Sequence, residues 1–398
     1  MWTGEVVADI SRTSAGAIIE NRFFVDLPDA DFMYPGDVLH YYIQATDSDG
    51  RTSTLPHDVS GFGDFSPGTV FDRTFTVRGL PTITDAAGAQ PDILVINDFG
   101  RSGGEAAFTI SFRNLGYLEG VHHDTYTVMG PTSGVSNGIG SAGAHGATGA
   151  QLAGYEHMFY FAGDLTTILL SDGSYFGVND KGDDIGTLED WHALPGTRNI
   201  AYFGDNIAHA LVNDSADGLA YLTNTMGVEY VDQDVSSAIG GQLTPVITAS
   251  PYGSTWFATD YVANGGCPAV NEFDQILPLA GAETGHHFRS VDGTPIMSVA
   301  ASVIHPTAIG IDITFPYSMR FIEEVMARDV GVSARTQLFA EVLGLFTAPA
   351  GGVPVAVPDA PPVRLSAFPN PFNPTTVVTF TAAPGSRGSV KVFNLRGE

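Results

Sequence analysis

The sequence predicts an α/β fold with a doubly wound, mainly parallel sheet, flanked by an N-terminal β-sandwich and a C-terminal β segment. The first observation is a continuous apolar run at residues 92–97, of the kind that is buried on both faces of a parallel sheet. The second is that such runs alternate with amphipathic stretches over about 250 residues. The third is that two runs end in a glycine-aspartate pair, which is typical of strands that lead into loops.

Residues 1–80 have the pattern of short antiparallel strands. The stretch 22–26 reads as one strand, and residues 38–45 alternate between apolar and polar before the tight turn Asp47–Gly50. The sequence from Pro35 to Arg51 resembles the central hairpin of fibronectin type III and related immunoglobulin-like domains. The resemblance implies a β-sandwich, which we expect to be incomplete at its front.

Residues 91–347 carry the strand and helix alternation. After the first run, a helix is expected at 105–115, strands at 157–162 and 199–203, and helices at 183–194 and 206–211. A late strand is expected at 308–315 and a closing helix at 335–346. Ligands of such sheets gather at the carboxyl ends of the strands. The residues there, Asp98, Asp164 and Asp205, are therefore the candidate ligand-binding residues.

The order of these elements, with Leu152–Tyr155 before a strand that ends in Gly163–Asp164, resembles class I glutamine amidotransferase-like domains of secreted bacterial proteins. A generic flavodoxin-like or Rossmann-like domain is the alternative. An active amidotransferase carries a cysteine at the sharp turn between strand and helix, whose strain exposes the thiol. This chain has Phe203–Asn206 there, and no matching His-x-Glu pair follows. The resemblance therefore implies the fold without the activity.

Asp205 at that turn has two interpretations. An aspartate at a helix start is most simply an N-cap, and a carboxylate nucleophile is the less favoured alternative. A second catalytic candidate is the single cysteine, Cys267, which follows two glycines. His286 or His287 could serve as its base, although lone cysteines are commonly small buried residues.

Two acidic stretches could bind a metal, and calcium is the ion that their oxygens would suit. One contains Asp47 and Asp49, and the other contains Asn179, Asp180, Asp183 and Asp184. Neither has the twelve-residue spacing of an EF-hand. Aspartate and asparagine are also the ordinary residues of turns and caps. We therefore expect no cofactor, with calcium at one of these stretches as the alternative.

The C-terminal part points to export. Residues 348–362 are rich in proline, alanine and glycine and are expected to form an extended linker. Residues 363–398 follow, with Pro369–Pro374 before an alternating strand at 376–381 and a second strand at 389–393. This motif resembles the start of the immunoglobulin-like sorting domain of the bacterial type IX secretion system. The resemblance implies an extracellular or outer-surface location, the export machinery as a partner, and a chain that is a fragment of a longer protein.

Composition limits the remaining function classes. The 398 residues hold 44 acidic and 17 basic side chains, a net charge of −27, with only two lysines, Lys181 and Lys391. Nucleic acids and anionic membranes are therefore unfavourable partners. No apolar run is long enough for a transmembrane helix. We expect a non-catalytic accessory region that binds a protein or glycan partner, with a hydrolase that uses Cys267 as the alternative.

Overall fold

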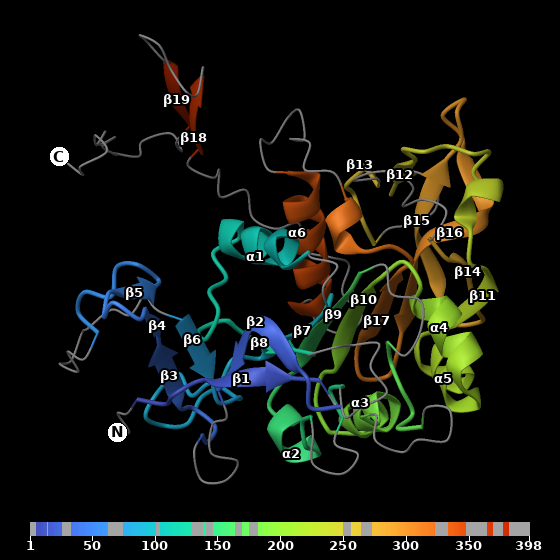
Figure 1. Ribbon diagram of the computed structural model, residues 1–398. Coiled ribbons are helices and arrows are strands. Elements are labelled where there is room, and N and C mark those ends of the chain that lie inside the picture. Colours follow the sequence, from blue (N-terminus) through green and yellow to red (C-terminus); the bar gives the residue numbers. More distant parts are fainter. Residues whose placement is uncertain are drawn as a thin grey trace.

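The computed structural model describes most of the chain, and Figure 1 shows its arrangement. The described residues are 5–13, 15–25, 33–62, 75–100, 104–128, 138–140, 146–163, 169–174, 182–249, 256–263, 273–322 and 333–347, together with the backbone of strands 364–368 and 377–381. An 11-stranded mixed sheet forms the centre of the molecule. The predicted mixture of helices and strands is therefore confirmed at this level.

Five strands of the sheet are parallel to one another: β7 (Ile93–Asp98), β8 (His123–Thr127), β9 (His157–Ala162), β10 (Asn199–Phe203) and β17 (Ile311–Phe315). They lie in the order β8-β7-β9-β10-β17. Every residue of β7, β9 and β10 is buried, because both faces of these strands are covered. The continuous apolar runs of the sequence thus lie where their pattern predicts.

The other six strands extend the sheet beyond β17 with antiparallel pairings. They are β11 (Val228–Asp232), β12 (Val246–Thr248), β13 (Tyr261–Val262), β14 (Gln275–Pro278), β15 (Glu283–Arg289) and β16 (Pro295–Pro306). The sheet is therefore mixed, whereas the sequence pattern predicts a mainly parallel one. The physical reason is that residues 228–306 contain no long crossover helix in their described part, and parallel neighbours require such a connection.

Helices cover both faces of the parallel strands. On one face, α1 (Glu105–Asn114) and α6 (Ala334–Thr347) pack through Phe112 and Phe339, whose ring centroids are 5.1 Å apart. The other face carries α2 (Gly149–Leu152), α3 (Asp184–His192), α4 (Ile207–Asp214), α5 (Ala216–Ala220) and the π-helix Tyr221–Thr225. Figure 1 shows α1 and α6 on the upper side of the strands and α2 and α3 below them. Two 3-10 turns, Val235–Ser237 and Met319–Phe321, are the remaining helical elements of the described residues.

The N-terminal part consists of three two-stranded sheets. These are β1 (Asp9–Arg12) with β2 (Ile18–Phe24), β3 (Val38–Tyr41) with β6 (Phe75–Arg78), and β4 (Ile43–Thr46) with β5 (Thr52–Leu55). The expected strand at 38–45 is thus divided between two sheets. Apolar side chains remain exposed here, Phe23 at 64% and Leu55 at 59%. The complete β-sandwich stays a prediction.

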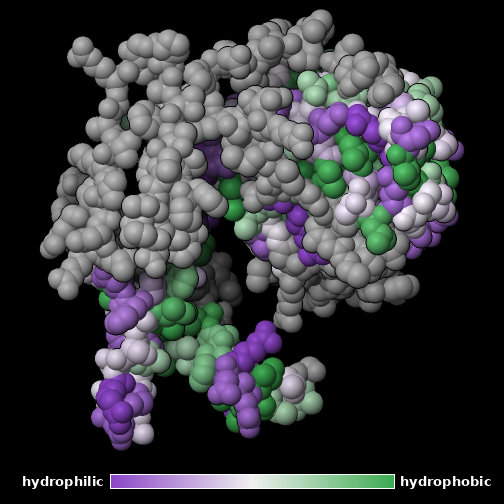
Figure 2. Space-filling view, turned by 90° about the horizontal axis from the view of Figure 1, so that it is seen from above, coloured by the Kyte–Doolittle hydropathy of each residue, from purple (hydrophilic) through white to green (hydrophobic). Residues whose placement is uncertain are grey.

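The described surface mixes hydrophobic and hydrophilic side chains. Seen from above in Figure 2, green and purple atoms alternate in small groups over the main body. Near the C-terminus, β18 (Arg364–Phe368) pairs with β19 (Val377–Thr381), which confirms the strand expected at 376–381. The strand expected at 389–393 lies outside the described residues. No helix in the described ranges is both long and apolar enough to cross a membrane.

Candidate functional site

The carboxyl ends of the parallel strands carry buried aspartates. Asp98 ends β7 with 1% of its surface exposed, and Asp205 follows β10 with 0% exposed. The hydroxyl of Tyr160 donates a hydrogen bond to Asp98. Asp164, the third candidate of this edge, lies outside the described residues. The two described carboxylates therefore belong to the interior, and their role as ligand contacts remains a prediction.

The turn after β10 is close-packed. A Cβ at Gly204 would lie 2.7 Å from Cγ1 of Ile207 and 3.0 Å from Cβ of Ala162, so only glycine fits without a shift of its neighbours. The N-cap position of α4 is Asn206, whose side chain makes no cap hydrogen bond and instead accepts one from Gln233 at 2.8 Å. The interpretation of Asp205 as the N-cap is therefore wrong.

Asp274, the residue directly before β14, supplies the missing cap. Its Oδ2 accepts hydrogen bonds from the backbone N–H groups of Ala208 at 2.9 Å and His209 at 3.2 Å, at the start of α4. Burial raises the pKa of this carboxyl well above its ordinary value, although the two N–H donors oppose the shift. Sequence reasoning missed Asp274 because its helix lies 66 residues away in the chain. No local pattern marks such a contact.

The two candidate histidines lie in β15, inside the antiparallel half of the sheet. Nδ1 of His286 is 2.8 Å from the hydroxyl of Ser302, and its ring stacks on Phe257 with centroids 4.3 Å apart. Burial, with a smaller contribution from His287, lowers the pKa of His286 to about 3. Burial also lowers the pKa of His287, which is 4% exposed. Cys267 lies outside the described residues, so the proposed pairing of thiol and imidazole stays untested.

The first metal candidate is a turn in the structure. Oδ1 of Asp47 accepts hydrogen bonds from the backbone N–H groups of Asp49 at 2.9 Å and Arg51 at 2.8 Å. The guanidinium of Arg51 also pairs with both carboxylates. Their negative charge is thus already balanced by donors of the same turn, as expected for an Asx turn.

The second metal candidate organises loops around α3. Asp183 caps the helix by accepting from the N–H of Gly186 at 2.9 Å. Asp184 is buried and accepts from the N–H groups of Ile139 at 2.6 Å and Ser171 at 3.0 Å. The other two members, Asn179 and Asp180, lie outside the described residues. Within the part that the structure describes, no cluster of three or more histidine, cysteine or acidic side chains is arranged for a metal ion.

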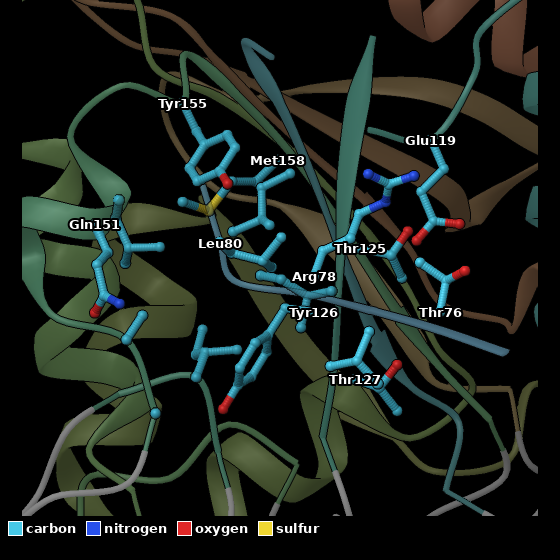
Figure 3. A pocket seen from close by; sticks show the side chains of 17 residues that line it. Thr76, Arg78, Leu80, Glu119, Thr125, Tyr126, Thr127, Gln151, Tyr155 and Met158 are labelled. Carbon is cyan, nitrogen blue, oxygen red and sulfur yellow. The ribbon is translucent and has the colours of Figure 1, made fainter. Parts of the chain in front are cut away.

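A pocket of about 850 Å³ opens beside β8, the outermost parallel strand. Figure 3 shows its lining residues. Leu94, Ile96 and Met158 form an apolar floor on the sheet, and residues of β6 also line the pocket. The full lining comprises Thr76, Val77, Arg78, Leu80, Leu94, Ile96, Glu119, Thr125, Tyr126, Thr127, Ile139, Gly146, Ala147, Gln151, Leu152, Tyr155 and Met158. A cavity of this size suits a small molecule or a short peptide segment.

The polar groups of the pocket divide into fixed and available ones. The hydroxyl of Tyr126 donates to the carbonyl of Gly138 at 2.8 Å, and that of Tyr155 donates to Asp124 at 2.6 Å. These two tyrosines are therefore held by the protein itself. Two charged side chains, Arg78 and Glu119, lie across the pocket from Gln151 in Figure 3. The sequence pattern gave no signal for this pocket, because β6 and β8 are brought together only by the fold.

Comparisons with known proteins assign no family to this chain. No protein-family model and no curated protein matches it. A cytoplasmic protein from Salmonella typhimurium has a TM-score of 0.36 at 10% identity, over 78% of this chain and 96% of its own. A polyextremophilic β-galactosidase from the haloarchaeon Halorubrum lacusprofundi has 0.34 at 16%, over 71% and 34%. A ThuA-like protein from Parabacteroides merdae has 0.34 at 7%, over 69% and 95%. TM-scores this low assign no activity to this chain.

Proposed function

We propose that this chain is a non-catalytic binding and accessory region of an exported, modular bacterial surface protein. Its α/β part is proposed to be a doubly wound domain of the amidotransferase or flavodoxin type. The strand order β8-β7-β9-β10-β17 supports this, because in chain order it reads 2-1-3-4-5, the order of flavodoxin-like sheets. Helices on both faces of these strands support it as well.

The structure of the turn after β10 is the main support for the proposed lack of catalytic activity. In an enzyme of this type, a nucleophile would stand exposed at that turn, where the helix N-terminus stabilises negative charge. Here the position holds Asp205, which is 0% exposed. The N–H groups of Ala208 and His209 at the helix start are already bonded to Asp274. A substrate would therefore find no reachable nucleophile at this turn, and two of the N–H donors of the helix start are already bonded.

The pocket beside β8 is the place where we propose that a partner binds. It combines an apolar floor with a few polar groups at its rim, which is the usual composition of a binding site. The lining residues that the structure describes include no cysteine, histidine, serine or aspartate. Its residues can therefore orient and desolvate a ligand, and they lack the common nucleophile and base pairs.

Export through the type IX system is proposed from the sequence at the C-terminus. The motif Pro369–Pro374 lies between β18 and β19, which pair with each other. Such a pair is compatible with the first strands of a sorting domain. An extracellular or outer-surface location follows from this proposal, and attachment to further domains is part of it.

The test is a turnover assay with generic amide and ester substrates. We expect the wild-type chain, Asp205→Asn and Cys267→Ser to show the same background rate. Turnover by the wild type that Asp205→Asn abolishes would overturn the non-catalytic proposal. Turnover that only Cys267→Ser abolishes would instead support the cysteine hydrolase, with His286 and His287 then tested by substitution.

A further inference from the structure

Two strand edges face the same pocket. The lining includes three successive residues of β6, Thr76 to Arg78, and three successive residues of β8, Thr125 to Thr127. Side chains of a strand alternate between its two faces, so three successive residues can line one cavity only along the strand's edge. The pocket is thus bordered by backbone as well as by side chains.

The hydrogen-bond register of β8 shows which backbone groups point outward. The N–H of Val128 donates to the carbonyl of Asn97 in β7 at 2.9 Å, and β8 is parallel to β7. In a parallel pair, alternate residues bond to the neighbouring strand. Residues 124, 126 and 128 therefore face β7, while Thr125 and Thr127 direct their N–H and C=O groups away from it. The carbonyl of His123, in the same outward set, accepts from Gly120 at 2.7 Å, as this register requires.

The same reasoning applies to β6. The N–H of Gly79 donates to the carbonyl of Asp37 at 2.8 Å, and β6 is antiparallel to β3. Alternation from Gly79 places Val77 toward β3 and the backbone groups of Thr76 and Arg78 on the opposite edge. β8 ends the central sheet, and β6 pairs with β3 alone. Among the described residues, nothing bonds to the outward N–H and C=O groups of Thr76, Arg78, Thr125 or Thr127.

We propose that the pocket binds a basic peptide of a partner protein in extended conformation, which adds a strand along the edge of β8. Backbone hydrogen bonds at an open strand edge, together with a pocket for alternate side chains, are the basis of strand addition. The apolar floor of Leu94, Ile96 and Met158 receives one apolar side chain of the peptide. This inference rests on the proposed binding role and names the class of partner.

Charge selects a basic peptide. The chain carries a net charge of −27, which attracts cationic segments and repels acidic ones. Glu119 lines the pocket and forms no ion pair in the described part of the chain. A lysine or arginine of the peptide pairs with its carboxylate. Arg78, whose guanidinium lies against Gly120, is placed to donate to a peptide carbonyl.

The test selects displayed random ten-residue peptides on the immobilised full chain and measures the affinity of an enriched peptide. Thr125→Pro removes one outward N–H and leaves the ladder to β7 intact, because proline is tolerated on such an edge. Thr125→Val keeps the N–H and is the matched control. We expect enriched peptides with alternating apolar residues and a basic residue. Thr125→Pro should weaken their binding about tenfold, and Thr125→Val less than about twofold.

Two further measurements keep the proposal falsifiable if Thr125→Pro unfolds, which circular dichroism will reveal. N-methylation of alternate peptide residues should abolish binding to the wild type. Glu119→Gln should weaken binding several-fold and reduce its dependence on salt. A selection that enriches no peptide, or a peptide that binds Thr125→Pro and its own N-methylated form undiminished, overturns the proposal. The turnover assay is independent of this result, so failure here leaves the non-catalytic proposal standing.

Discussion

Several buried carboxylates in this acidic chain are held by N–H and O–H donors of neutral groups, although Asp312 pairs with His192. Asp124 accepts from the hydroxyl of Tyr155 at 2.6 Å and the N–H of Thr82 at 2.8 Å. Asp184 and Asp274 accept from backbone N–H groups in the same way. With 44 acidic and 17 basic residues, the chain has too few cations to pair its carboxylates. Their burial is compensated by local hydrogen bonds.

Asp274 gives the first prediction. Asp274→Ala should lower the free energy of unfolding by about 1–2 kcal/mol, because the first turn of α4 loses its cap. Asp274→Asn keeps an oxygen acceptor and replaces a carboxyl whose pKa is raised by burial with a neutral amide, so it should cost less. Chemical denaturation at pH 7 measures both. Equal losses for the two variants would contradict the capping role.

His286 gives a prediction about pH. Its pKa in the folded chain is lowered to about 3 by burial, so the unfolded chain binds the proton more strongly. The stabilisation is present above the unfolded pKa of about 6.5 and is lost as the pH falls toward 3, by up to about 1.4 kcal/mol per pH unit for this group.

The double variant His286→Phe with Ser302→Ala removes both hydrogen-bond partners together, which avoids an unpaired hydroxyl. Its free energy of unfolding should fall less steeply than that of the wild type between pH 6 and pH 4. Denaturation curves at several pH values measure the slopes. Identical slopes would show that the ring of His286 takes up its proton freely in the folded state.

At the scale of elements, one arginine joins α3 to the strands beside it. Arg198 donates to the carbonyls of Trp191 at 3.2 Å, at the end of α3, and Pro195 at 3.0 Å, in the turn to β10. It also donates to the carbonyls of Tyr155 at 3.4 Å and Ala153 at 3.3 Å, between α2 and β9. With the carbonyl of Thr197 at 2.9 Å, the planar guanidinium donates to five carbonyls from two segments of the chain, which the single ammonium of a lysine could not do.

We therefore expect Arg198→Lys to lower the free energy of unfolding by about 1–2 kcal/mol, since one ammonium cannot donate to all of these carbonyls at once. The control is Arg289→Lys, whose ion pair with Asp260 is partly exposed and should cost less than about 1 kcal/mol. Thermal unfolding of both variants provides the comparison. A smaller loss for Arg198→Lys than for Arg289→Lys would refute this role.

The elements also show what a sequence pattern can predict. Four of the five parallel strands, together with α1, α3, α4 and α6, follow from apolar runs and helical spacing. The fifth, β8, has the sequence His-Asp-Thr-Tyr-Thr without an apolar run, and the pattern predicts no strand there. The antiparallel strands β12 and β13 have only three and two residues, and β15 contains register shifts, so no period marks them. The site could not be predicted at all. Asp274 and the pocket depend on contacts between distant segments.

For the whole molecule, the net charge of −27 acts on stability as well as on partners. Repulsion among surface carboxylates disfavours the compact state at low ionic strength and is screened by salt. We expect the melting temperature to rise when sodium chloride increases from roughly 10 mM to 500 mM. The reason is that the Debye length falls from about 30 Å to below about 8 Å, so that the surface carboxylates repel one another less. A melting temperature that falls with salt would mean that attractive ion pairs dominate the surface.

The central claim is that the strand-to-helix turn, where a nucleophile would be exposed, is sealed by packing. Carbodiimide labelling of carboxylates, mapped by mass spectrometry in the folded and the urea-unfolded chain, tests it most directly. Asp49, whose side chain is 64% exposed, serves as the internal reference. We predict that Asp49 is labelled in the folded chain and Asp205, which is 0% exposed, only after unfolding. Labelling of Asp205 in the folded chain as fast as that of Asp49 would contradict the account.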